Sequence, residues 1–357
     1  MRIAVVTTWY PSSADGVEGV FVHRHVEALR RGHEVSVLHL ASRPAAAEPG
    51  VQRLVLDRRS PRSVAAALAA ADRAARGADV LHTHVFSALL LLGPLAGRWR
   101  PPVPWLHTEH WSGVSDPASG GPLWRRAAGV RRVLARPDAV TAVSRYLADA
   151  VVPFRRDGTC HVVPNVVPAP PGLTPPPGGP VLRLLAVGNL RPVKDPLLAV
   201  AALAELRRRG VDARLRWVGA GPLEAAVRER AALLGVAGSL ELLGRRAPAE
   251  FAGEWAACDV FLLPSRHETF CVAGAEALAA GRPAVLGGRG GARDFAGPGV
   301  HLVDERSPAA FADAVQRAAA ERLPPERIAA PVRERFSPAA VAAAFDAVLS
   351  TLPTPRP

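Results

Sequence analysis

Apolar runs of strand length alternate with amphipathic stretches along most of the chain. The run at residues 3–8 is followed by a loop that contains glycines, a segment with helical spacing at 20–31 and a second apolar run at 34–40. Apolar residues at every third or fourth position predict helices, whereas short continuous apolar runs predict buried strands. The order of strand, glycine-bearing loop, helix and strand is typical of a doubly wound parallel sheet.

The same alternation starts again in the second half of the chain. A strand is predicted at 181–188 and a helix at 196–209, and between the two halves lies a segment, 164–180, with eight prolines. Because proline removes a backbone donor and interrupts helices and strands, this segment predicts a linker. The predicted organisation is an α/β chain with a Rossmann-like N-terminal domain at 1–163, the linker at 164–180, a Rossmann-like C-terminal domain at 181–336, and a terminal helix with its tail at 337–357.

The remaining elements of both predicted sheets come from the same patterns. Further strands are expected at 51–56, 79–84, 103–108, 138–144, 213–218, 240–244, 258–263 and 284–286. Further helices are expected at 63–76, 122–135, 145–152, 248–257, 272–280, 308–321 and 338–350.

The stretch 264–284, PSRHETFCVAGAEALAAGRPA, predicts a short helix that is buried on one side. The helical spacing ends at Gly281 and Pro283, which are typical residues after a helix. Glu276 falls on the inward stripe of this helix. An unpaired carboxylate is costly to bury, so Glu276 needs donors from the protein or from a ligand such as a ribose diol.

The amino end of the same helix offers a place for an anion. The amides of Phe270, Cys271 and Val272 have no acceptor inside the helix, and a diphosphate would satisfy them. Glu268, on the turn before them, would then face whatever the anion carries. An ordinary helix start, with Glu268 as a first-turn residue and Glu276 paired to an arginine, fits this segment equally well.

A single lysine stands out among the basic residues. The chain has 44 lysines and arginines, and only Lys194 is a lysine. It follows the predicted strand that ends at Gly188, and an ammonium is a compact partner for a phosphate.

Two predicted strands, 79–84 and 103–108, end in polar residues at the sheet edge where open α/β sheets bind ligands. Four histidines and Glu109 gather there. Neither the H-x-H nor the H-x-E-H spacing lies on a helix with a ligand face, so no catalytic metal and no cofactor are predicted. His110, the last of these histidines, is either a ligand-contacting group or a structural residue that bonds a backbone carbonyl.

The charge of the chain is strongly basic and uneven. The formal net charge is +12, and residues 1–170 hold 21 arginines against 13 acidic residues. Seven of these arginines lie between residues 98 and 136. This concentration fits an anionic membrane leaflet, a lipid-linked acceptor or nucleic acid, and it fits a solvated surface equally well. Two tyrosines and no interleaving of aromatic and basic residues argue against a nucleic-acid partner.

The compartment is predicted from cysteines and from apolar segments. Three scattered cysteines indicate neither a disulfide framework nor a zinc site. The first residues lead directly into a strand without the pattern of a signal peptide, and the longest apolar run, 85–97, is too short to span a bilayer. We expect a cytoplasmic protein, with peripheral contact at the inner face of the membrane through the basic N-terminal half.

Glu268 and Glu276, followed by A-L-A-A-G-R-P, resemble the E-x7-E signature of the retaining GT-B glycosyltransferases of family 4. The resemblance extends over nearly the whole chain. It implies two Rossmann-like domains that face each other across a cleft, with the C-terminal helix crossing back to the N-domain. It also implies that Glu268 contacts the donor sugar, that Glu276 holds the ribose, and that the amides between them hold the diphosphate.

The resemblance implies further contacts with the donor. The segment T-E-H at 108–110 is similar to the family segment whose histidine, here His110, lies beside the donor sugar. Gly19 in the first loop, Gly188 after the first strand of the second domain, and Gly219 in G-A-G-P match glycines near the nucleotide. In the family motif G-R-L-x-x-x-K-G the lysine matches Lys194.

The same motif contains a departure from the family. The usual arginine position holds Asn189, and Arg191, two residues further on, is the candidate for its phosphate-binding role.

The implied activity is transfer of a hexosyl unit from a UDP- or GDP-sugar, with retention, to a glycan or lipid-linked acceptor of the cell envelope. Two alternatives use similar nucleotide contacts. One is a GT-B epimerase of the UDP-GlcNAc 2-epimerase type, which needs no acceptor, and the other is a non-catalytic protein that binds sugar nucleotides or lipids. A two-lobed periplasmic binding protein is disfavoured because no export signal is visible.

Overall fold

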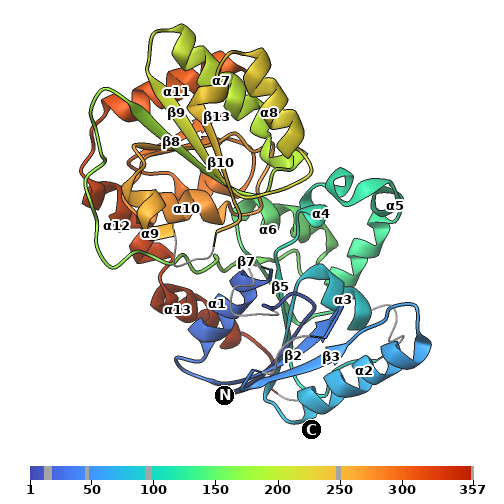
Figure 1. Ribbon diagram of the computed structural model, residues 1–357. Helices are drawn as coiled ribbons and strands as arrows, with labels where there is room; N and C mark the ends of the chain where they lie inside the picture. Colours follow the sequence, from blue (N-terminus) through green and yellow to red (C-terminus); the bar gives the residue numbers. More distant parts are fainter. Residues whose placement is uncertain (12–17, 45–47, 93–98, 247–250, 355–357) are drawn as a thin grey trace. The chain divides into compact units, whose positions relative to one another are not determined.

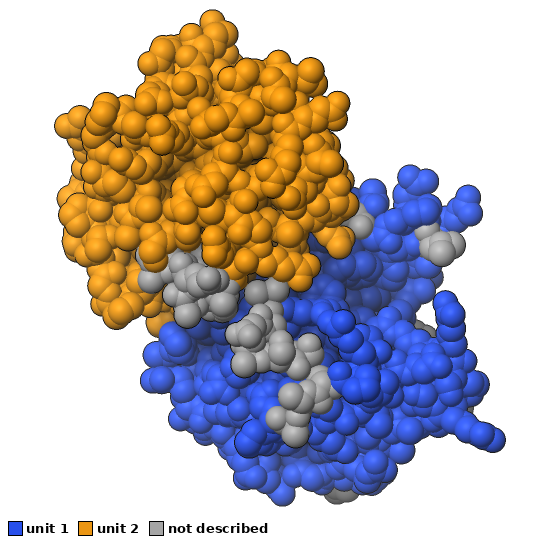
Figure 2. Space-filling view, in the orientation of Figure 1, with its two compact units in different colours: residues 1–166, 338–357 blue, residues 167–337 orange. Residues whose placement is uncertain are grey.

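The computed structural model describes residues 1–11, 18–44, 48–92, 99–246 and 251–354 (Figure 1). The chain forms two compact units, coloured separately in Figure 2. Unit 1 comprises Met1–Val166 and Pro338–Pro357, and unit 2 comprises Val167–Ser337. The boundaries predicted from the sequence, after 163 and after 336, lie three residues and one residue earlier.

Unit 1 is built on a seven-stranded parallel sheet with the strand order β3-β2-β1-β4-β5-β6-β7. Its strands are β1 (Arg2–Thr7), β2 (Glu34–Ala41), β3 (Val51–Val55), β4 (Val80–His84), β5 (Trp105–Glu109), β6 (Ala139–Ala142) and β7 (His161–Val162). The order reverses between β1 and β4. In doubly wound sheets, ligands bind at the carboxyl ends of the strands beside this reversal.

The helices of unit 1 include the last helix of the chain. They are α1 (Val20–Leu29), α2 (Pro61–Arg76), α3 (Phe86–Leu92), α4 (Ser112–Ser115), α5 (Gly121–Arg126), α6 (Arg145–Val151) and α13 (Pro338–Leu349). Figure 1 shows α13 beside α1, although the whole of unit 2 separates them in the sequence. Phe345 and Val348 of α13 are buried in one apolar cluster with Val22 and Val26 of α1. The predicted return of the C-terminal helix to the N-domain is therefore confirmed.

The basic helix predicted at 122–135 was wrong as a single element. The chain forms α5 and then a 3-10 segment, η2 (Ala128–Ala135). Gly129 lowers helix propensity at the junction. Nε1 of Trp124 and Nη1 of Arg131 donate hydrogen bonds to the carbonyls of Gly113 and Val114, at 2.7 and 2.9 Å. These contacts tie the segment to α4.

Unit 2 repeats the plan with a six-stranded parallel sheet of order β10-β9-β8-β11-β12-β13. Its strands are β8 (Leu182–Val187), β9 (Ala213–Val218), β10 (Leu240–Gly244), β11 (Val260–Leu263), β12 (Ala284–Gly287) and β13 (Val300–Val303). Its helices are α7 (Pro196–Arg208), α8 (Glu224–Leu233), α9 (Phe251–Ala256), α10 (Val272–Ala279), α11 (Pro308–Ala320) and α12 (Pro325–Arg335). Two doubly wound sheets of this order confirm the predicted fold class.

The proline-rich segment is held against unit 2 by a buried arginine. Arg282 is fully buried, and its guanidinium donates hydrogen bonds to the carbonyls of Trp255 and Thr174 at 2.7 and 2.8 Å. A third bond reaches Oγ1 of Thr174 at 2.9 Å. The predicted linker thus has no helix or strand, but it packs on unit 2 from Val167 onward.

No helix in the described part of the chain is long and apolar enough to cross a membrane.

Candidate functional site

Lys194 and Glu268 meet at the switch point of the unit 2 sheet. Lys194 ends a 3-10 turn, η4 (Pro192–Lys194), that follows β8, and Glu268 lies in the loop between β11 and α10. Nζ of Lys194 lies 2.5 Å from Oε1 of Glu268, and Oγ of Ser265 lies 2.6 Å from the same oxygen. The Lys194 and Glu268 side chains are 23% and 13% exposed, so the ion pair is largely removed from water.

The ion pair keeps Lys194 charged. Burial alone would lower the pKa of Lys194, but the negative charge of Glu268 and the hydrogen bond to it outweigh burial, so that the pKa is raised. A permanently charged ammonium that is mostly shielded from water can attract a phosphate strongly.

Arg306 holds the two loops of this site together. Its Nη2 donates to Oδ2 of Asp195 at 2.7 Å, next to Lys194 in the sequence. The same guanidinium donates to the carbonyls of Pro264 and Ser265 at 2.8 and 3.1 Å, in the loop that carries Glu268. Arg306 therefore positions the lysine loop against the glutamate loop. Sequence reasoning missed Arg306, because its place between β13 and α11 shows no motif.

The amino end of α10 lies in the same loop region. Cys271 is the N-cap residue in the left-handed conformation, with φ 74°, and no side chain caps the helix. Phe270 is buried, and its ring packs edge-on against Phe295 and Phe336 at 5.0 and 5.3 Å between centroids. The buried ring of Phe270 and the left-handed backbone of Cys271 together fix the direction in which the first amides of α10 point, including the amide of Val272.

Two further residues of this region have features that bear on their predicted roles. Burial raises the pKa of the Cys271 thiol to about 12, so this cysteine is not a thiolate nucleophile. Glu276 lies one turn into α10 and is only half-buried, whereas the sequence pattern placed it on the buried stripe with Ala275 and Ala279. Its contact with a ribose stays a prediction.

Glycines allow the strand ends of unit 2 to approach each other closely. Gly219 has φ 137°, and a Cβ there would lie 2.1 Å from the carbonyl oxygen of Gly188. A Cβ on Gly188 would lie 3.4 Å from Cε of Lys194. Packing within the chain therefore already explains why Gly219 is a glycine, and the donor contacts of both residues stay predictions.

Arg191 lies on the surface beside the lysine turn. Its carbonyl accepts a hydrogen bond from the amide of Lys194 at 3.0 Å, and its own amide donates to the carbonyl of Asn189 at 2.8 Å. The side chains of Arg191 and Asn189 are exposed. The phosphate contact of Arg191 stays a prediction.

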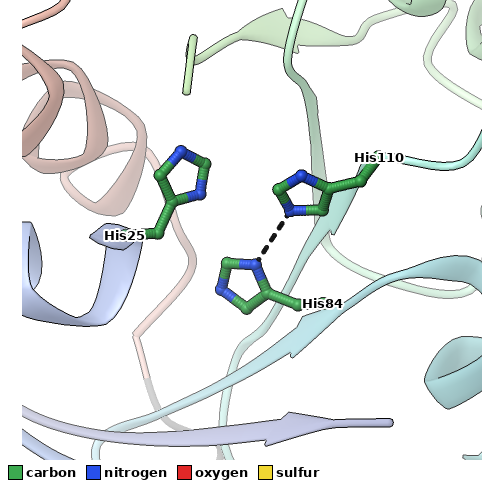
Figure 3. A group of neighbouring side chains, drawn as sticks. All are labelled: His25, His84 and His110. Atoms are coloured by element: carbon green, nitrogen blue, oxygen red, sulfur yellow. Dashed lines mark hydrogen bonds between the residues drawn. The ribbon is translucent and has the colours of Figure 1, made fainter. Parts of the chain in front are cut away.

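In unit 1, His110 follows β5 and forms part of a buried group of three imidazoles (Figure 3). Nδ1 of His84, at the end of β4, lies 3.2 Å from Nε2 of His110. His25 comes from α1, and its Nε2 donates to the carbonyl of Pro164 at 3.0 Å. Burial lowers the pKa of all three rings, in the case of His25 to about 4, so the three imidazoles are neutral at neutral pH.

The two other histidines predicted at these strand ends, His82 and His107, contact different groups. His82 bonds Oγ1 of Thr108 at 2.7 Å, whereas Nε2 of His107 lies 3.3 Å from Oε2 of Glu109. His25, the residue that joins His84 and His110, was not among the sequence candidates. A signal did exist, since His25 shares the inward stripe of α1 with Val22 and Leu29.

Gly19 is the N-cap residue of α1, and its backbone has the left-handed conformation, with φ 72°. A Cβ there would lie 2.4 Å from the amide nitrogen of Tyr10. Gly19 thus packs closely against the chain just after β1, which requires glycine whatever the ligand. Gly16, in the same loop, lies outside the described residues.

Family models match both halves of the chain. The model described as "Glycosyltransferase Family 4" matches residues 14–169, and the model described as "Glycosyl transferases group 1" matches residues 182–321. The first match lies in unit 1 except for its last three residues, and the second lies within unit 2.

Named relatives and solved structures show the same likeness. A D-inositol 3-phosphate glycosyltransferase of Frankia alni is 30% identical over 277 residues, which are 67% of this chain and 65% of that protein. A GDP-mannose-dependent alpha-(1-6)-phosphatidylinositol dimannoside mannosyltransferase of Mycobacterium tuberculosis is 40% identical over 29% of this chain and 27% of that protein. The matched segments thus span less than two thirds of both relatives. The structure of Anabaena Alr3699/HepE in complex with UDP and glucose superimposes with a TM-score of 0.75 and 18% identity, covering 99% of this chain and all of that one.

Proposed function

The chain belongs to glycosyltransferase family 4, and on that premise we propose that it transfers a hexosyl unit from a nucleotide-diphosphate sugar to an acceptor, with retention at the anomeric carbon. The observation that carries the proposal is the pair of Lys194 and Glu268 beside the amino end of α10. A cation and a row of helix amides at the switch point of a sheet suit the diphosphate of an activated sugar, and the adjacent carboxylate suits the hydroxyls of its sugar.

The difficult step of this reaction is departure of the nucleoside diphosphate. Negative charge grows on the diphosphate as the bond to the anomeric carbon breaks. Lys194, Arg191 and the amides of Phe270, Cys271 and Val272 are proposed to stabilise it. Preorganised donors of this kind contribute a few kcal/mol each. Binding of the diphosphate would draw Lys194 from Glu268 and leave that carboxylate to accept hydrogen bonds from sugar hydroxyls.

The remaining roles concern the sugar and the nucleoside. Glu276 is proposed to accept the ribose hydroxyls, and His110 is assigned to the transferred sugar. No covalent nucleophile is needed, because the leaving phosphate can take the acceptor proton on the same face. The proposed reaction uses neither a catalytic metal nor a cofactor.

The donor is proposed to be a UDP- or GDP-sugar. The Anabaena structure holds UDP, and the name of the mycobacterial relative specifies GDP-mannose. The acceptor is proposed to be a glycan or a lipid-linked precursor. An anionic acceptor suits the basic unit 1, and the Frankia relative is named for a phosphorylated acceptor.

Contact with an anionic membrane is proposed for the basic segment that includes α5 and η2. Arg125, Arg126 and Arg132 are exposed there. Lysines and arginines near an anionic leaflet contribute about 1 kcal/mol each. A cytoplasmic location with peripheral attachment at the inner face follows as part of the proposal, and no nucleic-acid partner is expected.

The test combines donor binding with turnover. Purified protein is mixed with a panel of UDP- and GDP-hexoses, and the melting temperature and the release of nucleoside diphosphate are measured with and without inositol phosphate or lipid-linked acceptors. We expect one donor to stabilise the protein and to be turned over when an acceptor is added. Glu268→Gln should lose turnover, whereas Glu241→Gln, whose side chain is 61% exposed on β10, serves as the control.

Two results would contradict the proposal. Isomerisation of the sugar nucleotide without acceptor would identify an epimerase. Donor binding without nucleotide release, with every acceptor tried, would identify a binding protein.

A further inference from the structure

We propose that His25, His84 and His110 form a binding site for one divalent transition-metal ion, such as zinc. The three residues come from α1, from the end of β4 and from the residue after β5, and all three are buried. Figure 3 shows the rings gathered around one point, with a nitrogen of His25 turned toward the other two rings.

The spacing of the nitrogens suits a tetrahedral ion. One ligand nitrogen of each histidine lies within 4.8 Å of the others, and the facing nitrogens of His84 and His110 are 3.2 Å apart. Zinc binds imidazole nitrogen at about 2.0–2.1 Å, which separates neighbouring ligands of a tetrahedron by about 3.4 Å. His84 and His110 already have nearly this separation, so only His25 has to move closer.

His25 supplies a lone pair that no other group uses. Its Nε2 carries the proton, because that atom donates to the carbonyl of Pro164. Nδ1 is then an acceptor, and within the described part of the chain this buried atom has no hydrogen-bond partner. The bond from Nε2 to a backbone carbonyl is also what orients metal-binding histidines in known sites.

The surroundings of His110 complete the argument. With an ion on Nε2, its proton would lie on Nδ1, which is buried and has no close hydrogen-bond partner among the described residues. Asn165 interacts with that ring and raises its pKa, and its Oδ1 is a buried acceptor. Metal binding would therefore fix a donor on Nδ1 beside this acceptor.

A buried carboxylate next to the site can offset the charge of the ion. Glu109 is fully buried, and its Oε1 accepts from the amides of His110 and Trp111 at 2.8 Å each. It is not a ligand, since its other oxygen faces His107. With three neutral imidazoles as ligands, this nearby negative charge reduces the cost of burying a divalent cation.

The ion is inferred to inhibit transfer, and this part rests on the proposed function of His110. An ion on Nε2 of His110 would occupy the one basic lone pair of this neutral ring and leave none for a sugar hydroxyl. The site would thus make the enzyme sensitive to free zinc without making zinc a cofactor.

Cobalt titration of the chelator-treated protein tests the site directly. We expect one Co²⁺ per chain, with the intense visible absorption of a tetrahedral site, and displacement by Zn²⁺. His25→Gln and His84→Gln should each weaken binding at least tenfold. His82→Gln, a buried neighbour of His84 on the same strand, is the matched control and should keep the site.

Three results would overturn the proposal. The wild-type protein could show no stoichiometric Co²⁺ absorption. This result does not depend on whether any variant folds. His25→Gln and His84→Gln could bind as well as wild type, which would place the ion elsewhere. His82→Gln could weaken binding as much as they do, which would show disturbed packing instead of lost ligands.

The inhibition is tested separately, by zinc titration of the release of nucleoside diphosphate. We expect half-inhibition at the zinc concentration that half-fills the site, and at least tenfold more zinc for His25→Gln, each compared with its own metal-free rate. Full occupancy without inhibition would overturn the inhibitory role. If no donor is turned over at all, the proposed transferase function fails, while the cobalt result still decides whether the metal site exists.

Discussion

Nζ of Lys194 lies 2.5 Å from Oε1 of Glu268, although 74 residues separate them in the chain. The contact joins the loop after β8 to the loop after β11, the two neighbouring strands at which the order of the unit 2 sheet reverses. An anionic ligand that binds this ammonium would compete with the carboxylate for it. This competition is the physical basis of the proposed donor site.

Replacing Lys194 tests whether this ion pair serves catalysis or stability. Lys194→Ala should lower turnover by roughly 100-fold or more, because a preorganised charge at the leaving group is lost. The melting temperature should fall by only a few degrees, since Ser265 still lies within hydrogen-bond distance of Glu268. Arg209→Ala removes an arginine that pairs with Glu205 and Asp313, away from the site, and serves as the control. If the free energy of unfolding fell by as many kcal/mol as the activation free energy rose, the ion pair would be structural.

Glu276 should contribute to nucleotide affinity. Glu276→Ala removes a charged acceptor, and such hydrogen bonds are worth about 1.5–3 kcal/mol, so Kd for the nucleoside diphosphate should rise about 10- to 100-fold. Isothermal titration measures the change. Glu229→Ala, on the exposed face of α8, is the matched substitution and should leave Kd unaltered. Equal affinity of Glu276→Ala and wild type would contradict the ribose role.

Gly219 should be essential for the packing of unit 2. Gly219→Ala places a Cβ 2.1 Å from the carbonyl oxygen of Gly188 at a φ of 137°. The clash and the backbone strain together should reduce the free energy of unfolding by roughly 3 kcal/mol, measured with urea. At Gly238 an added Cβ would have no neighbour within 4 Å among the described residues, so Gly238→Ala should change stability by less than about 0.5 kcal/mol. Similar unfolding curves for the two variants would show that the strand ends are not so close.

The buried histidines should make metal-free protein sensitive to mild acid. Because burial depresses the pKa of His25 from 6.5 to about 4, the unfolded chain binds its proton first as the pH falls. Its contribution is complete above about pH 6.5 and is lost progressively as the pH falls toward 4; it amounts to roughly 3 kcal/mol at most.

Urea unfolding at pH 7 and pH 5 measures this dependence. His25→Gln should lose less stability than wild type between these values, because glutamine does not titrate. His161→Gln, in which the substituted histidine is exposed on β7, is the control. A pH dependence that is the same in His25→Gln and wild type would show that His25 is accessible to protons in the folded protein.

Much of the fold could be predicted from periodicity, but some elements could not. The pattern did not distinguish α8, α12 and β13, which have weak or mixed periodicity. In α8 only two of the ten residues, Val227 and Ala231, are buried, so its apolar stripe is short. In α12, Pro331 interrupts the helical reading of the sequence although the helix continues through it. In such segments, packing against neighbouring elements overrides local preference.

For the candidate site, the sequence alone determined the residue types and their places at the strand ends and helix starts. Lys194, Glu268 and Glu276 could be found in this way, because an isolated lysine and two spaced carboxylates are visible without coordinates. Only the tertiary structure decided which of these groups touch, that Arg306 ties their loops together, and that His25 joins His84 and His110. The reason is physical: local sequence governs backbone conformation and the alternation of buried and exposed positions, whereas contacts between distant segments depend on how whole elements pack.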